Sequence, residues 1–103
     1  MTHTSRRVFV NITYENPDGT LQTENRQDVA VDILINALAT KINEYAMTIP
    51  YTPADLLNKP VGMIKDYSDA IVVLSQEKIE PIFIRFVYRD GVRKTYEILG
   101  EKE

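Results

Sequence analysis

The chain of 103 residues contains no cysteine and no tryptophan, and its only histidine is His3. Without cysteine there is no disulfide framework and no thiolate to act as a nucleophile or a metal ligand. A single histidine near the N-terminus leaves no internal candidate for a histidine base, a catalytic triad or a histidine-ligated metal. These absences exclude most hydrolase mechanisms.

Glycine is also scarce, and the residues are dispersed at Gly19, Gly62, Gly91 and Gly100. No glycine-rich phosphate cradle or dinucleotide-binding fingerprint can be assembled from them. Asp66 and Asp69 are three residues apart, but they lack the additional oxygen ligands and the glycine-turned loop of a calcium motif. We therefore expect no enzyme, no bound metal and no cofactor.

Long apolar runs are missing as well. No stretch of about 18 apolar residues exists, and residues 1–7 are not followed by an apolar segment of the signal-peptide type. The proportions of hydrophobic (44%) and charged (26%) residues are those of a globular protein, and the length suits one core. We expect a flexible N-terminal arm (1–7), a single domain (8–100), a C-terminal tail (101–103) and a cytoplasmic location.

The C-terminal segment "IFIRFVYRDGVRKTYEIL" (82–99) has the pattern of a β-hairpin. A two-residue turn at Asp90-Gly91 would mix apolar and charged groups on one face. A three-residue loop of Arg89, Asp90 and Gly91 makes one face almost wholly apolar, and it predicts a positive φ at Gly91. The resulting pairs are Tyr88 with Val92, Phe86 with Lys94, Ile84 with Tyr96, and Ile82 with Ile98.

A second hairpin is predicted near the N-terminus. Apolar and polar residues alternate over residues 8–15, which is the period of a half-buried strand. The sequence Asn-Pro-Asp-Gly at 16–19 fits a type I turn. The returning segment 20–27 is polar apart from one leucine, so we expect an exposed edge strand there.

Helical periodicity occupies the middle of the chain. Apolar residues recur at spacings of three and four over residues 31–45, which predicts an amphipathic helix capped by Asp28 or Asp32. Thr52-Pro53 is typical of a helix start, so a short helix is expected to about Asn58 and to end at Lys59-Pro60.

Residues 61–77 fit either of two structures. Their apolar residues follow one helical face over three turns, whereas the β-branched run near 70–75 also fits a buried strand. We choose the helix because its pattern extends further. The order β-β-α-α-β-β then predicts an α+β two-layer sandwich, with a four-stranded, mainly antiparallel sheet and helices on one face. An extra strand would bring the order closer to the β-grasp arrangement of ubiquitin-like proteins.

The outward face of the predicted sheet combines arginine with aromatic side chains, and these residue types are enriched at the hot spots of protein interfaces. We expect a small non-catalytic interaction module that self-associates or docks a protein partner through this open face. Single-stranded nucleic-acid binding by the same face is the alternative, and a merely solvated face is a third interpretation. The net charge of −3 and the lack of a nucleic-acid signature favour protein, and no membrane partner is expected. The candidate binding residues are Arg7, Phe9, Phe83, Arg85, Val87, Arg89 and Arg93.

Overall fold

The computed structural model describes residues 6–102. The elements are β1 (Arg7–Glu15), β2 (Leu21–Ala30), α1 (Val31–Thr48), the short 3-10 turns η1 (Ile49–Tyr51) and η2 (Ala54–Leu56), α2 (Asn58–Leu74), β3 (Ile82–Val87) and β4 (Arg93–Glu101). The predicted order β-β-α-α-β-β is confirmed. The alternative strand near 70–75 is wrong, since most of that segment continues α2. His3 and most of the expected N-terminal arm lie outside the described residues.

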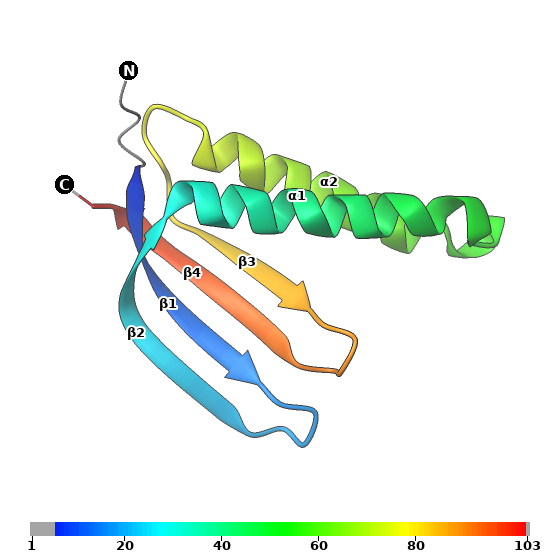
Figure 1. Ribbon diagram of the computed structural model, residues 1–103, viewed down its shortest axis with the longest axis horizontal. Coiled ribbons are helices and arrows are strands. Elements are labelled where there is room, and N and C mark those ends of the chain that lie inside the picture. The colour runs from blue at the N-terminus through cyan, green and yellow to red at the C-terminus, as the bar shows by residue number, and fades with distance from the viewer. Residues whose placement is uncertain (1–5, 103) are drawn as a thin grey trace.

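The four strands form one antiparallel sheet in the order β2-β1-β4-β3. Both long helices lie on the same face of this sheet, as Figure 1 shows. The two hairpins therefore meet through β1 and β4, while β2 and β3 are the edges. No helix within residues 6–102 covers the opposite face of the sheet, and we call it the open face.

The predicted register of the second hairpin is confirmed. Ile82 pairs with Ile98, and the ladder continues to Phe86 with Lys94. Beyond the strands, the Tyr88 N–H donates to the Val92 carbonyl at 2.9 Å, which closes the expected three-residue loop. Gly91 has φ +88°, as the loop requires.

The first hairpin also turns where predicted. The Gly19 N–H donates to the Asn16 carbonyl at 2.9 Å, which is the bond of a β-turn over residues 16–19. The returning strand β2 is exposed from Leu21 to Asp28, as expected of an edge strand with one polar run.

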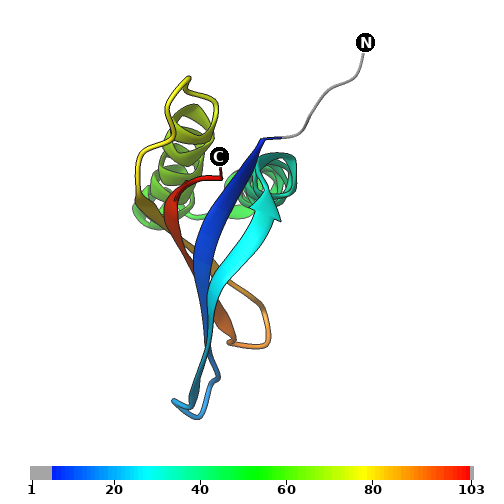
Figure 2. The same ribbon diagram turned by 90° about the vertical axis from the view of Figure 1, so that its left-hand side faces the viewer.

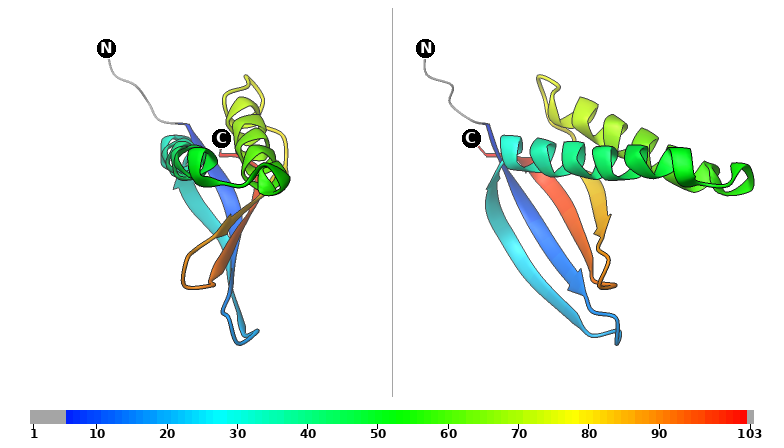
Figure 3. Two further views of the ribbon diagram at one scale, coloured as in Figure 1. Left: turned by 90° about the vertical axis from the view of Figure 1, so that its right-hand side faces the viewer. Right: turned by 45° about the vertical axis from the view of Figure 1, so that its right-hand side comes forward.

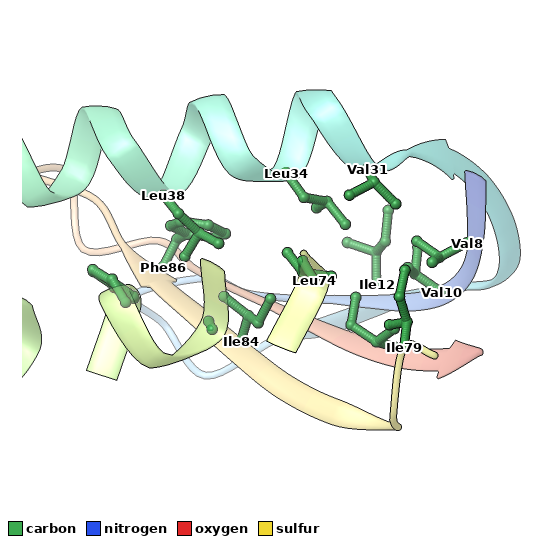
Figure 4. Close-up of a cluster of buried hydrophobic side chains, with 13 residues drawn as sticks. Val8, Val10, Ile12, Val31, Leu34, Leu38, Leu74, Ile79, Ile84 and Phe86 are labelled. Atoms are coloured by element: carbon green, nitrogen blue, oxygen red, sulfur yellow. The ribbon is translucent and has the colours of Figure 1, made fainter. Parts of the chain in front are cut away.

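The core lies between the helices and the upper half of the sheet. Leu34 and Leu38 of α1 and Leu74 of α2 point down onto the strands, where they meet Phe86 and its neighbours (Figure 4). The Phe86 ring stacks on Tyr67 at a centroid distance of 5.6 Å and meets Tyr96 edge-on at 5.7 Å. Such aromatic pairs add to the hydrophobic term that buries them.

The predicted cap of the first helix is wrong. Helix α1 follows β2 without a loop, its N-cap is Ala30, and no side chain caps it. The Asp28 carboxylate instead contacts Arg7 and Lys102. One amide at the helix start that has no intrahelical acceptor is bonded by the backbone instead, because the Val31 N–H donates to the Arg6 carbonyl at 2.8 Å.

The predicted stop at Pro60 is also wrong. Residues 54–56 form only a single 3-10 turn, and α2 begins at Asn58 with Pro60 inside its first turn. Proline is tolerated there because the first amides of a helix have no intrahelical acceptor.

Helices and sheet diverge away from the core. The far ends of α1 and α2 extend beyond the sheet, and both hairpin turns lie away from the helices (Figures 1 and 3). Figure 2 shows the sheet nearly edge-on, with its lower part uncovered by any helix. The sheet is therefore packed on one face over part of its length only.

Replacing Phe86 by alanine is expected to lower the free energy of unfolding by about 3 kcal/mol or more, because its ring is 2% exposed and leaves a cavity. Phe83→Ala is the matched control on the same strand, since Phe83 is 73% exposed and should lose less than about 0.5 kcal/mol. Urea unfolding measures both. Equal losses for the two variants would contradict the register.

Alanine at two glycines should act in opposite directions. At Gly91 the positive φ disfavours a side chain, and an added Cβ would lie 3.1 Å from Pro17 Cγ, so Gly91→Ala should destabilise by about 1 kcal/mol or more. At Gly62, within α2, a Cβ meets nothing within 4 Å, and Gly62→Ala should stabilise by about 0.5 to 1 kcal/mol. Thermal unfolding of both variants is the measurement, and stabilisation at Gly91 would refute the loop geometry.

Candidate protein-binding face

Strand alternation brings most of the predicted site residues onto the open face. Neighbours of the buried residues Val8, Val10, Ile84 and Phe86 must point away from the helices. Arg89 is the exception, because it lies in the β3–β4 loop beyond the last strand residues. The six candidates on the open face are Arg7, Phe9, Phe83, Arg85, Val87 and Arg93.

Carboxylates lie among these arginines. Arg7 Nε is 2.6 Å from Asp28 Oδ1 across the β1–β2 pair, and Lys102 Nζ is 2.6 Å from the other Asp28 oxygen. Hydrogen bonds from Lys102 and then from Arg7 lower the pKa of the Asp28 carboxyl below its ordinary value. Because Asp28 stays ionised at neutral pH, it compensates positive charge at this corner.

The centre of the open face is polar. Glu15 Oε2 lies 3.9 Å from Arg93 Nη1 across the β1–β4 pair. Further along the same two strands, Asn11 Nδ2 donates to Glu97 Oε1 at 3.1 Å. Positive and negative groups therefore lie side by side across the β1–β4 pair.

Arg26 is a member of this face that the sequence pattern did not reveal. Its guanidinium lies over the Phe9 ring, 4.3 Å from the centroid. The contact depends on an irregularity in the β1–β2 register, where Arg26 has φ 50° and donates its N–H to Asn11 Oδ1 at 2.8 Å. The polar sequence of β2 predicts an edge strand but gives no sign of this bulge.

On the open face, β3 carries the side chains with the fewest contacts to the rest of the protein. Phe83 is 73% exposed, and within residues 6–102 Arg85 makes no ion pair. Val87 is 38% exposed beside them. We call Phe83, Arg85 and Val87 the β3 patch. Here an exposed ring lies beside a cation that no carboxylate compensates.

A groove of about 560 Å³ adjoins the β3 patch, between β3 and α2. Met63 and Asp66 of α2 line one wall, and Phe83 and Arg85 line the other. The Tyr67 hydroxyl crosses from α2 to β3 and donates to the Arg85 carbonyl at 2.6 Å. This groove was not predicted, because it depends on how α2 lies along the edge strand.

Residues 6–102 contain no group of three or more histidine, cysteine, aspartate or glutamate side chains placed to hold a metal ion. No helix in the same range is long and apolar enough to cross a membrane.

Comparisons with known proteins found no matching family model, no matching curated protein and no matching solved structure. The function is therefore argued from the contacts and exposure of the residues themselves.

The phenol of Tyr67 should make the free energy of unfolding depend on pH in the alkaline range. Burial raises the pKa of its phenol to about 12 from an ordinary value near 10, so its contribution is complete below pH 10 and is lost as the pH rises through 12. Tyr67→Phe should cost about 1 kcal/mol at pH 8 through loss of the bond to Arg85, and the cost should shrink as the pH rises from 10 to 12. Urea unfolding at several pH values tests this, with Tyr51→Phe as the exposed control. A cost independent of pH would contradict it.

Proposed function

We propose that this chain is a small non-catalytic interaction module that docks a protein partner through the open face of its sheet. The β3 patch supplies most of the binding energy. The single observation that carries the proposal is Phe83, a large aromatic side chain that is 73% exposed at the second position of the edge strand β3.

The surroundings of Phe83 support this role. Aromatic and arginine side chains dominate interface hot spots because they bury a large area and make directional hydrogen bonds. Arg85 follows Phe83 on the same face of β3, and Val87 extends the apolar surface by one further position. The paired charges elsewhere on the face resemble the polar rim that surrounds such a centre.

Nucleic acid is a weaker candidate for the same face. Phosphate binding draws on arginines that are available to the backbone, and two of the predicted arginines are held by Asp28 and Glu15. To bind a phosphate, each of these two arginines would have to give up its carboxylate, so the number of charge pairs would hardly increase. The alternation of sign favours a protein surface of mixed charge.

Self-association is the other outcome to be distinguished. Sedimentation velocity over a range of concentrations measures it directly, with Phe83→Ala as the variant. A monomer at all concentrations points to a different chain as the partner, whereas an association that Phe83→Ala abolishes assigns the face to a second copy.

The proposal is tested by affinity capture from the native source, followed by measurement of the affinity for the purified partner. Phe83→Ala should weaken binding by about 30-fold, equivalent to about 2 kcal/mol, as expected of a hot spot. Leu21→Ala is the matched control, because Leu21 is 67% exposed and pairs with Glu15 at the far edge of the sheet.

Added salt should change the affinity less than truncating Phe83 does. Equal losses for the two truncations would contradict a centre on β3. Binding of single strands that weakens steeply with salt and disappears with Arg85→Ala would replace the proposal by the nucleic-acid alternative.

A further inference from the structure

The free edge of β3 can be read from its hydrogen bonds. Backbone groups in an antiparallel pair point alternately toward and away from the partner strand. The Tyr88 N–H bonds to Val92, so Phe86 and Ile84 also face β4, and the intervening Phe83 and Arg85 direct their N–H and carbonyl groups outward. This outward row lies at the end of the sheet.

The helices close one half of this edge and leave the other half open. Tyr67 donates to the Arg85 carbonyl at 2.6 Å, and Lys41 Nζ donates to the Val87 carbonyl at 3.2 Å. Within the described chain, the Phe83 N–H, the Phe83 carbonyl and the Arg85 N–H bond to no protein group. Three adjacent backbone groups are thus ready to pair with another strand.

The open half of the edge coincides with the groove beside α2. Met63 and Ala70 give its helix wall an apolar surface, and Ile84 lies at its floor. A strand placed beside Phe83 would direct alternate side chains into this groove and the others toward the open face.

The α2 wall of the groove is acidic, whereas Arg85 lies on the β3 wall. Asp66 and Asp69 line the α2 wall, and within residues 6–102 the only cation paired with either is Lys65, whose Nζ lies 2.9 Å from Asp69 Oδ2 on the exposed surface. If β3 paired with β3 of a second copy, the α2 helices of the two copies would lie next to each other. Asp66 and Asp69 of one copy would then face Asp66 and Asp69 of the other. Like charges in that position oppose such a dimer, and they favour a basic segment.

We infer that the partner adds an extended basic segment to β3 as a fifth strand. The segment bonds to the N–H and carbonyl of Phe83 and to the N–H of Arg85, and its groove-facing lysine or arginine side chains pair with Asp66 and Asp69. This is strand addition, in which main-chain bonds supply affinity and side-chain pockets supply specificity. The inference rests on the proposed function and names the chemistry of the partner.

The test uses the full chain labelled with ¹⁵N and an acetylated, amidated hexapeptide of alternating lysine and valine. Titration should give saturable amide shifts centred on Phe83 and Arg85, and hydrogen exchange at both amides should slow by at least about tenfold when the peptide is bound. The same hexapeptide with glutamate in place of lysine is the control ligand, and it should bind at least about tenfold more weakly.

Two sets of variants separate charge from backbone. The double variant Asp66→Asn with Asp69→Asn should lower the affinity for the lysine peptide by about tenfold at low salt. Asp55→Asn, on the exposed turn η2, also removes a negative charge and should have little effect on that affinity. Phe83→Pro removes the ring and the outward N–H of residue 83 but leaves the hydrogen bonds between β3 and β4 in place. This variant should therefore bind the lysine peptide more weakly than Phe83→Ala, which removes only the ring.

Several results would overturn the inference. No saturable shift at millimolar peptide, equal binding of the glutamate peptide, shifts confined to another surface, or a β3-mediated dimer would each do so. If the natural partner requires Phe83 but is indifferent to both aspartates and to the Phe83 N–H, strand addition fails while docking on the open face stands.

Discussion

The pairing of β1 with β4 is the constraint on which the rest of this structure depends. It joins two hairpins that are separated by both helices, and it places Ile12 opposite Tyr96 and Thr13 opposite Thr95. In this register the buried apolar residues of β1, β3 and β4 share one face, so a single layer of two helices can cover them. The same register collects Arg7, Phe9, Phe83, Arg85 and Arg93 on the open face. It also brings the two turns together, with Gly91 against Pro17.

Tyr67 connects this core to the surface proposed to bind a partner. Its ring lies between Tyr45 and Phe86, with centroid distances of 6.1 and 5.6 Å, and it is 3% exposed. Its hydroxyl satisfies the Arg85 carbonyl at the edge of the sheet. One side chain thus fixes how α2 lies along β3 and limits where the edge is open. The shape of the groove is therefore a consequence of core packing.

Much of the fold could be predicted from local patterns. The register of the β3–β4 hairpin followed from Gly91 and from the requirement that one face be apolar. The helix predicted within residues 61–77 followed from a periodicity sustained over three turns, and it corresponds to the greater part of α2. The start of α2 did not follow, because Pro60 is as compatible with a first helical turn as with a helix end. The cap at Asp28 failed because that carboxylate is used by basic groups distant in the sequence.

The candidate site was less accessible from sequence, because its electrostatics depend on pairing between hairpins. The sequence places Arg93 on the outward face, but only the β1–β4 register brings Glu15 to it, and only the β1–β2 bulge brings Arg26 to Phe9. The sequence was sufficient to predict which of the candidate strand residues lie on the open face. Which charges remain uncompensated there depends on long-range contacts.

Amide hydrogen exchange at Phe83 and Phe86 measures directly whether β3 is the docking edge, when the native chain is compared alone and with its captured partner. We expect the Phe86 amide, bonded within the β3–β4 ladder, to be protected in both states, and the Phe83 amide to exchange rapidly when free and slowly in the complex. Protection of Phe83 in the free chain, or unchanged rapid exchange of Phe83 in the complex, would contradict the assignment of β3 as the docking edge.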